Sequence, residues 1–378
     1  MKKIVLVANS GWYIYNFRLD LIKDIKDAGY DLNIITPFDD YVKIIRNENY
    51  NHKEWKLSRK SINPIKEIKS IIDLIKIYKE IKPDIVHHFT IKSCLYGTIA
   101  AKISNVNNVV NAITGLGHVF VGRNITTKIL RKALLPIYRI IFRSRRSNII
   151  FQNEDDLQEF VKLKITKKKS SHLIQGSGVD TEKFSPSKKN IKISYNYPIK
   201  VLFPSRLIIE KGIIELIDAC ELLWQENFDF DLVIAGETND SNRSSISEDK
   251  LEYIKNNKRI YCLGHVKDMK SLYEEVDIVV LPSWREGLSR ALIEAASMEK
   301  PIITTNATGC TQIVDHGING LLTPIRSAES LMLALKFLFN NPLLSRKFGI
   351  NIRKKIIKNF RTSLINQSTL DFYSKLKN

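Results

Sequence analysis

The chain contains little cysteine, with only Cys94, Cys220, Cys262 and Cys310 among 378 residues. The four lie far apart and form no C-x-x-C pair, so the sequence suggests neither a zinc knuckle nor a disulfide framework. Long apolar runs are also missing. The opening MKKIVLVANSGWYIYNFRLD reaches only five apolar residues in a row, which is too few for a signal peptide. These features favour a protein of the reducing cytoplasm.

No stretch is apolar enough to cross a bilayer. The longest stretch without Asp, Glu, Lys or Arg, residues 103–122, contains four asparagines and three glycines. These are too many polar and small residues for a membrane-spanning helix. We therefore expect no transmembrane segment.

Acidic residues are absent over a long part of the chain, residues 85–153. The formal net charge is +19, and residues 1–178 hold 31 of the 59 Lys and Arg residues but only 16 of the 40 Asp and Glu residues. A positive field of this kind can attract nucleic acid, an anionic membrane surface or a phosphate-bearing substrate.

Apolar runs alternate with amphipathic stretches along the whole chain. The predicted strands of a first domain are KIVLVA, DLNIIT, DIVHHF, NVVNAIT and NIIFQ, and those of a second are KVLFPS, FDLVIAG, RIYCLG, DIVVLPS, PIITT and NGLLT. A length of 378 residues also favours two domains. Alternating strands and helices predict an α/β protein with two doubly wound parallel sheets and ligands at the carboxyl ends of the strands. We place the domains at residues 1–180 and 181–361, with a C-terminal helix, residues 362–378, that crosses back to the first domain.

Two glutamates in PSWREGLSRALIEAASMEKPIITT suggest a binding site for an elongated ligand. Glu286 follows a predicted strand, and a helix predicted to begin near Gly287 contains Glu294. In a helix these positions lie about 80° apart with a rise of about 12 Å, so the carboxylates would grip two ends of one ligand. The amides of Gly287, Leu288 and Ser289 could hold an anion between them. The alternative is an acidic helix start and a surface glutamate.

Two cations follow the first strand of the second domain. In LFPSRLIIEKG, Arg206 can fork across phosphate oxygens and Lys211 can supply a point charge. Together they could replace a metal ion at a diphosphate. A solvated basic turn before a helix is the alternative.

The motifs GSGVDTEKFSP, PSRLIIEKG, REGLSRALIEA and KPIITTNATGCTQIVDHGINGLL, in this order and spacing, resemble the retaining glycosyltransferases of family 4. The resemblance covers nearly the whole chain and implies the GT-B fold, in which two Rossmann-like domains enclose a cleft. Within the family, ANSGWYIYNFRLDLI, HFTIKSCLYGTIAAKI and TGLGHVF are similar to enzymes that extend sugars linked to polyprenyl diphosphate in O-antigen and capsule assembly.

The family pattern implies roles for individual residues. Arg206, Lys211 and the amides after Glu286 would bind the donor diphosphate, Glu286 would face the donor sugar, Glu294 the ribose, and Gly264 the nucleobase. His118 would contact the sugar near the reacting carbon. The residues expected to bind the acceptor are Ser10, Gly11, Asn16, Arg18 and Lys92.

The sequence also departs from the family in two places. Gln312 stands where many members have Glu, and Ser10, Gly11 and Trp12 replace the usual glycine pair. We expect these departures to change a contact near the donor sugar and the acceptor loop.

His118 can also be read as an ordinary core histidine. Gly115 and Gly117 flank it and permit close backbone approach, which in this context favours a site role. The same stretch is a poor dinucleotide fingerprint, because its spacing is G-x-G-x4-G and no acidic residue follows for thirty positions.

Metal binding is not expected. Asp229 and Asp231 have D-x-D spacing but enter a strand at its amino end, away from the ligand edge. His87 and His88 end a strand without further ligands at metal spacing. We expect a UDP-sugar as co-substrate, no cofactor and no metal.

Residues 128–146 combine basic and apolar side chains. Lys128, Arg131, Lys132, Arg139, Arg143, Arg145 and Arg146 alternate with isoleucine, leucine and phenylalanine. Such a segment can rest on an anionic leaflet, which predicts peripheral attachment at the inner face of the cytoplasmic membrane. An ordinary core helix with a solvated basic face is the alternative.

The sequence thus predicts a metal-independent glycosyltransferase that moves a hexose or an N-acetylhexosamine from a UDP-sugar to a lipid-linked sugar. A UDP-sugar epimerase of the same shape is one alternative. A basic nucleic-acid-binding protein is another, but no helix-turn-helix, RNA-binding or zinc motif accompanies the charge.

Overall fold

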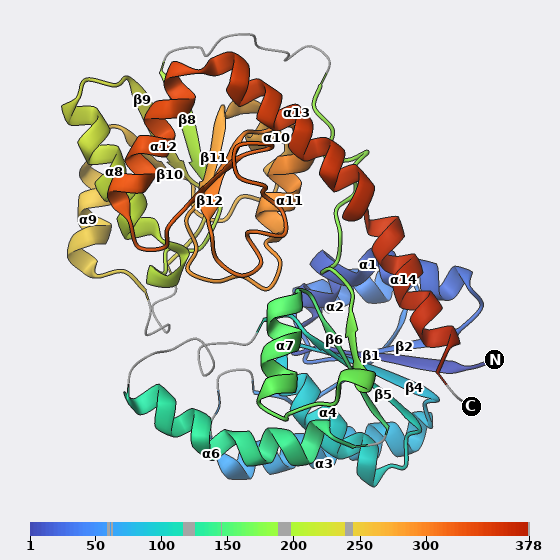
Figure 1. The fold of residues 1–378 in the computed structure, drawn as a ribbon. Coiled ribbons are helices and arrows are strands. Elements are labelled where there is room, and N and C mark those ends of the chain that lie inside the picture. Colours follow the sequence, from blue (N-terminus) through green and yellow to red (C-terminus); the bar gives the residue numbers. More distant parts are fainter. Residues whose placement is uncertain are drawn as a thin grey trace. The chain divides into compact units, whose positions relative to one another are not determined.

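The computed structural model describes residues 1–58, 61, 63–115, 125–144, 146–187, 198–238 and 245–376 (Figure 1). It divides into two compact units, one made of Met1–Ser177 with Ile365–Asn378 and the other of Gly178–Leu364. Each unit is a parallel sheet with helices packed on it, which confirms the predicted α/β class with two doubly wound domains.

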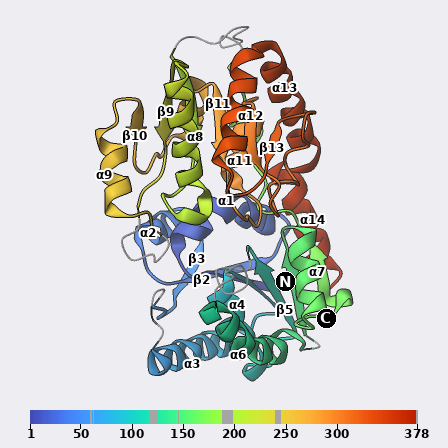
Figure 2. The same cartoon turned by 60° about the vertical axis from the view of Figure 1, so that its left-hand side comes forward.

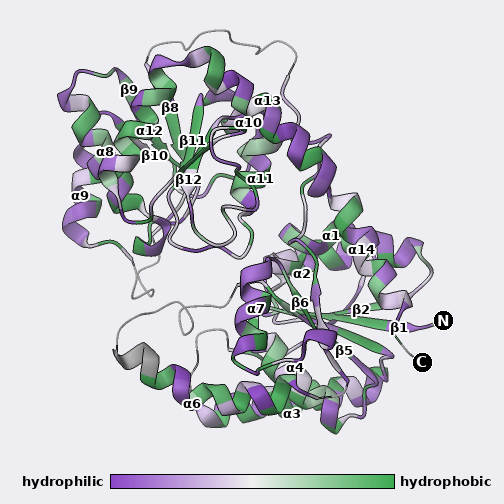
Figure 3. Ribbon diagram, in the orientation of Figure 1, coloured by the Kyte–Doolittle hydropathy of each residue, from purple (hydrophilic) through white to green (hydrophobic). Residues whose placement is uncertain are grey.

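The first unit is built on a seven-stranded sheet in the order β3-β2-β1-β4-β5-β6-β7. Its strands are β1 (Lys3–Val7), β2 (Asp31–Thr36), β3 (Asn51–Glu54), β4 (Ile85–Phe89), β5 (Asn108–Ile113), β6 (Ser147–Phe151) and β7 (Ser171–Leu173). All neighbouring pairs are parallel. The central strands are mostly apolar and almost entirely buried because both faces of the sheet are covered (Figure 3).

The helices of this unit divide between the two faces. They are α1 (Gly11–Asp27), α2 (Asp40–Asn47), α3 (Pro64–Ile81), α4 (Ile91–Ile103), α6 (Ile125–Phe142), α7 (Glu154–Lys162), the short 3₁₀ turn η1 (Lys168–Ser170) and α14 (Thr362–Ser374). Ile4 and Leu6 of β1 pack in one core with α1, α2 and α14. Val5 and Val7 face the opposite side, where α3, α4, α6 and α7 form the other cores.

Two strands of this sheet were not predicted. β3 and β7 are the edge strands, and most of their side chains are partly or fully exposed. Edge strands need no continuous apolar run because only one neighbour pairs with them and solvent covers the rest. Their sequences therefore lack the signal that identified the other strands.

The second unit is built on a six-stranded parallel sheet in the order β10-β9-β8-β11-β12-β13. Its strands are β8 (Ile199–Phe203), β9 (Phe230–Ile234), β10 (Ile260–Cys262), β11 (Ile278–Leu281), β12 (Ile302–Thr305) and β13 (Leu321–Thr323). Its helices are η3 (Ile209–Lys211), α8 (Ile213–Gln225), α9 (Glu248–Asn256), α10 (Met269–Glu275), α11 (Arg290–Ser297), α12 (Ala328–Asn340) and α13 (Pro342–Asn359). All six strands were predicted.

The C-terminal part of the chain forms two consecutive helices. α13 ends at Asn359 and α14 begins at Thr362, and Phe360 and Arg361 between them lie beside Val179. The Val179 amide donates to the Phe360 carbonyl at 2.9 Å. In α14, the Tyr373 hydroxyl lies 2.5 Å from His87 Nδ1, so the end of the chain belongs to the first unit. No helix in the described part of the chain has the length and hydropathy needed to cross a membrane.

Candidate active site

The candidate donor site lies where the strand order of the second sheet reverses. β8 is followed in the chain by β9 and β10 on one side, while β11 pairs with its other edge. The loops that leave β8 and β11 therefore diverge from neighbouring strand ends, the usual position for a ligand in a doubly wound sheet. Arg206 and Lys211 follow β8, and Glu286 follows β11.

Gly212 brings Lys211 to the exit of β11. Its φ of +75° lies in the left-handed region, and a Cβ there would be 2.2 Å from the Pro282 carbonyl oxygen. Only glycine fits this position without strain. The Trp284 amide also donates to the Glu210 carbonyl at 2.9 Å. The turn η3 is thus fixed against the loop after β11.

Lys211 and Glu286 form the central ion pair of this site. Lys211 Nζ lies 2.5 Å from Glu286 Oε1, and the side chains are 19% and 11% exposed. The buried Ser283 hydroxyl donates to the same oxygen at 2.6 Å. A partly buried pair of this kind holds a cation at a fixed point, which is the arrangement needed to oppose charge that develops on a leaving phosphate.

A third loop holds the Glu286 backbone. The Glu286 amide donates to the Thr308 carbonyl at 3.0 Å, and the Thr305 hydroxyl donates to the Ser283 carbonyl. A Cβ on Gly309 would lie 2.5 Å from the Glu286 carbonyl oxygen. The sequence interpretation missed Ser283 and Thr305. Both residues could have been predicted from their positions at the ends of β11 and β12, because the carboxyl ends of neighbouring parallel strands lie at the same edge of a sheet.

The predicted start of the helix after β11 was wrong. α11 begins at Arg290, and Ser289 is its N-cap, with its Oγ accepting from the Leu292 amide at 3.4 Å. Serine at the N-cap satisfies a helix-start amide, whereas glycine has low helix propensity. Gly287, Leu288 and Ser289 therefore belong to a loop before the helix. The angle and rise calculated for Glu286 and Glu294 do not apply, because only Glu294 lies in the helix.

Glu294 is an interior residue. It is only 9% exposed, which removes the alternative that it is a surface glutamate. Burial raises the pKa of Glu294, while the positive charge and hydrogen bond of Arg290 oppose that shift. Arg290 Nε donates to Glu294 Oε1 at 2.7 Å, one turn away on the same helix. The carboxylate is thus desolvated and oriented, as a group that reads ligand hydroxyls must be.

The replacement Glu294→Gln is expected to separate stability from donor binding. Because the folded-state pKa of Glu294 is raised, its charged form costs stability once the pH rises through that pKa, and glutamine removes this cost. We expect an unchanged or higher Tm at neutral pH but an affinity for UDP lowered by about tenfold or more, since a charge-assisted hydrogen bond is lost. Glu275→Gln, at an exposed position of α10, is the control. Unchanged UDP affinity in Glu294→Gln would contradict the role.

Arg206 lies at the other side of the same edge. A Cβ on Gly236 would be 1.9 Å from the Ser205 carbonyl oxygen, so the exits of β8 and β9 are in direct contact. The Arg206 side chain is exposed, and no carboxylate of the described residues lies within 4.0 Å of it. Gly264, with a φ of +64°, has Glu237 Oε1 4.0 Å from its Cβ position. Glu237 was not predicted as a site residue.

The candidate acceptor residues follow β1 and β4, where the order of the first sheet reverses. Ser10 is the buried N-cap of α1, and its Oγ accepts from the Tyr13 amide at 3.2 Å. Asp39 Oδ2 accepts from the Trp12 amide at 3.0 Å, and Asp39 Oδ1 would be 2.4 Å from a Cβ on Gly11. A carboxylate of the protein therefore already occupies the start of α1. Asn16 Nδ2 donates to the Trp12 carbonyl at 2.9 Å.

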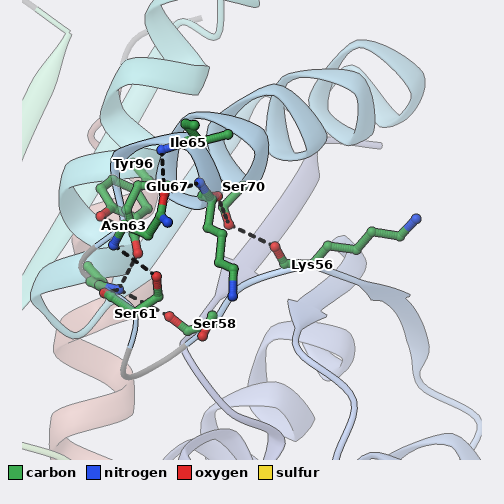
Figure 4. A network of polar contacts seen from close by, with 10 residues as sticks. Lys56, Ser58, Ser61, Asn63, Ile65, Glu67, Ser70 and Tyr96 are labelled. Carbon is green, nitrogen blue, oxygen red and sulfur yellow. Dashed lines mark hydrogen bonds and ion pairs between the residues drawn. The ribbon is translucent and has the colours of Figure 1, made fainter.

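Lys92 already has as many acceptors as its ammonium group has hydrogens. Nζ lies 3.1 Å from the Ser58 carbonyl, 2.7 Å from the Ser61 carbonyl and 3.0 Å from Glu67 Oε1. Tyr96 donates to the other oxygen of Glu67 (Figure 4). To bind an acceptor, Lys92 would have to exchange one of these partners.

Arg18 is placed away from solvent. Its side chain is 5% exposed, lies over the Phe89 ring and donates to the Gly176 carbonyl at 3.3 Å. This burial connects α1 to the segment that leads out of the first unit. A direct contact between Arg18 and an acceptor would require that packing to open.

The remaining candidate residues are histidines, of which one lies outside the described residues and two are buried in the core. His118 lies outside the described residues, and so does Gly117. His87 and His88 are buried core residues of β4, as the sequence interpretation favoured. His88 Nε2 lies 2.8 Å from the Tyr78 hydroxyl. Burial lowers the pKa of His88 to about 4, and the hydrogen bond that His88 Nδ1 donates to Asn111 Oδ1 opposes that shift. Among the described residues, no cluster of three or more His, Cys, Asp and Glu is placed to hold a metal ion.

Two family models match the chain. Residues 3–153 match the model described as glycosyl transferase 4-like, and residues 185–355 match the model described as glycosyl transferases group 1. Together they include every candidate site residue and the greater part of both units.

Curated relatives of similar length include two bacterial transferases. The chain is 26% identical, over 99% of both chains, to the N,N'-diacetylbacillosaminyl-diphospho-undecaprenol alpha-1,3-N-acetylgalactosaminyltransferase of Campylobacter jejuni. It is 28% identical, over 80% of this chain and 78% of the relative, to the UDP-Gal:alpha-D-GlcNAc-diphosphoundecaprenol alpha-1,3-galactosyltransferase of Escherichia coli.

Solved structures with the same fold include HepE from Anabaena in complex with UDP and glucose. That structure superposes with a TM-score of 0.80 over 100% of both chains at 18% identity. Sucrose-phosphate synthase from Thermosynechococcus elongatus gives a TM-score of 0.78 over 100% of this chain and 99% of the other, at 17% identity. Both are GT-B proteins, so the GT-B fold is confirmed.

Proposed function

Because the chain is a glycosyltransferase of the GT-B fold, built from a glycosyl transferase 4-like region and a glycosyl transferases group 1 region, we propose that it transfers a sugar from a UDP-sugar to a sugar carried on polyprenyl diphosphate. The donor sugar is an N-acetylhexosamine or a hexose. The product is an intermediate of a bacterial surface polysaccharide or glycan. The names of the relatives from Campylobacter jejuni and Escherichia coli, both of which act on diphospho-undecaprenol-linked sugars, support this acceptor class.

The Lys211–Glu286 ion pair at the reversal of the second sheet is the observation that carries the proposal. Its separation of 2.5 Å leaves the ammonium beside the exits of β8 and β11, where a diphosphate would lie. Arg206 adds a second cation at the same edge. The two cations supply the charge that a metal ion supplies in other transferases. We therefore propose transfer without a metal.

The reaction we propose retains the configuration of the donor sugar. The bond between the sugar carbon and the phosphate oxygen breaks, and the acceptor oxygen forms its bond on the same face. The acceptor proton passes to the departing phosphate oxygen. Lys211 and Arg206 stabilise the leaving diphosphate, Glu286 orients the sugar, Glu294 binds the ribose and Gly264 leaves room for the base. His118 is proposed to contact the sugar near the reacting carbon.

We place the enzyme at the inner face of the cytoplasmic membrane, where it would meet a lipid-linked acceptor. α6 contains no acidic residue, and Ile129, Leu130, Ile137 and Ile140 are exposed on it. Lys132 is exposed on the same helix, and Arg143 is exposed directly after its end. A basic helix with an exposed apolar row supports peripheral attachment to an anionic leaflet.

The test is a panel of UDP-sugars followed by a transfer assay. The correct donor should raise the Tm in proportion to its concentration relative to Kd, with about 2.7 kcal/mol of stabilisation at a hundredfold excess over Kd. The stabilising UDP-sugar should then extend a short polyprenyl-diphosphate sugar in detergent, with and without chelator. Conversion of the nucleotide sugar without any acceptor would show an epimerase instead, and loss of transfer in chelator would refute metal independence.

A further inference from the structure

Helix α3 carries an apolar row that the described part of the first unit leaves exposed. Ile65, Ile68 and Ile72 are 65%, 57% and 46% exposed. Their spacing of three and four residues places them on one side of the helix. The opposite side is buried in the core through Leu74, Ile77, Tyr78 and Ile81. α3 therefore has two apolar sides, and the sheet accounts for only one of them.

A lysine-lined pocket adjoins the exposed row. It has a volume of about 420 Å³ and is lined by Lys56, Ser58, Lys66, Lys69, Ser70, Ile72, Asp73 and Lys76. Ile72 belongs both to the pocket and to the exposed row. No carboxylate in the described ranges lies within 4.0 Å of any of the four ammonium groups, which leaves them available to an anion from outside. The single carboxylate, Asp73, accepts from the Lys56 amide at 2.9 Å.

The pocket wall is held in place by hydrogen bonds inside the protein. Ser70 Oγ donates to the Lys56 carbonyl at 2.8 Å, and Figure 4 shows the Lys56 side chain extending away from that bond. The Lys92 ammonium binds the Ser58 and Ser61 carbonyls and Glu67. Burial would raise the pKa of Glu67, but hydrogen bonds from Tyr96 and Lys92 hold that pKa below its ordinary value, so the carboxylate stays charged. The lysines thus project from a preformed wall.

A second helix on the same face of the sheet, α6, also has exposed apolar residues. α4 packs against both α3 and α6, and Figures 1 and 2 both show the three helices together beneath the strands of this unit. The exposed apolar residues of α6 are between 48% and 73% exposed, whereas Tyr138, Ile141 and Phe142 of the same helix are buried in the core. Two helices therefore present apolar rows flanked by basic residues.

We propose that the α3 face of the first unit docks on an anionic phospholipid bilayer and that the lysine pocket binds a lipid headgroup phosphate. The isoleucines of the row enter the boundary between headgroups and acyl chains, and the four lysines neutralise phosphates beside them. This docking site extends the proposed function. It depends on that function only for the identity of the lipid-linked acceptor. Charge complementarity favours this occupant. Four lysines that have no carboxylate partner among the described residues lie beside an apolar row, and they match an anionic lipid surface better than an uncharged protein.

The experiment measures vesicle binding of the full chain without nucleotide sugar. Vesicles of phosphatidylcholine alone and of phosphatidylcholine mixed with phosphatidylglycerol are compared by flotation at low and high salt. We expect binding only to the anionic vesicles, weakened by salt. Lys66→Glu/Lys69→Glu should lower that binding by about thirtyfold or more, because each cation near the surface contributes about 1 kcal/mol. Ile68→Ser should lower it without changing net charge.

The matched control is Lys23→Glu/Lys43→Glu, which changes the net charge equally on α1 and α2, across the sheet. An equal loss in both double variants would overturn the site, because binding would follow total charge alone. Displacement by inorganic phosphate at constant ionic strength, or a shift of duplex DNA with the same dependence on Lys66 and Lys69, would also overturn it. Transfer to a detergent-solubilised acceptor is assayed in parallel with the unmodified protein. If that protein transfers the sugar but does not bind anionic vesicles, only the docking site is refuted; if it binds the vesicles but does not transfer the sugar, only the proposed function is refuted.

Discussion

Replacing Lys211 by alanine is expected to lower kcat by about 10²- to 10³-fold, the usual cost of removing one preorganised group that opposes transition-state charge. The KM for the lipid-linked acceptor should hardly change, because Lys211 lies at the donor edge of the second sheet. The variant also leaves Glu286, 11% exposed, without its cation. Steady-state kinetics with saturating UDP-sugar and a thermal melt measure the two effects separately.

Lys200→Ala is the matched control for this prediction. Lys200 is an exposed lysine of β8 at the opposite end of the same sheet, and its removal should leave kcat unchanged. Adding Glu286→Gln to Lys211→Ala should cost less than the product of the single effects, since the two residues act as one pair. A kcat for Lys211→Ala equal to that of the unmodified protein would refute the proposed phosphate role.

The strands could be predicted because a doubly wound sheet buries both faces of its central strands. DIVVLPS and PIITT contain continuous apolar runs for that reason, and the residues after them identified the ligand edge. The site residues Arg206, Lys211 and Glu286 were placed at strand exits by the same reasoning. The sequence could not show that Lys211 and Glu286 are bonded, because 75 residues separate them and a glycine contact joins their loops.

The sequence-based predictions were wrong or incomplete where the structure depends on which residue caps a helix or on contacts with residues distant in sequence. The helix after β11 was predicted three residues too early, although Ser289 offered a better N-cap than Glu286. The acceptor assignment of Lys92 could not foresee bonds to Ser58, Ser61 and Glu67, which are 25 to 34 residues away. In α3, isoleucines occur on all sides of the helix, so periodicity alone could not show which row the sheet would leave exposed.

Replacing Gly212 by alanine is expected to destabilise the second unit strongly. A left-handed φ of +75° costs a non-glycine residue about 1–2 kcal/mol. The added Cβ would also lie 2.2 Å from the Pro282 carbonyl oxygen, and backbone cannot give way as the end of a side chain can. Overpacking of this kind costs about a further 1–3 kcal/mol. For a unit of this size, each kcal/mol lowers Tm by about 2–4 °C.

Gly317→Ala separates the two causes. Gly317 also has a left-handed φ, +74°, in the same unit, but no atom lies within 4 Å of its Cβ position. Gly317→Ala should show only the cost of the left-handed φ. The difference in Tm between the two variants therefore reports the cost of the clash between the added Cβ and the loop after β11. Gly212→Ala should also lose transfer activity well below its Tm, because the clash moves Lys211 away from Glu286. Equal melting and activity in the two variants would mean that this approach does not position the ion pair.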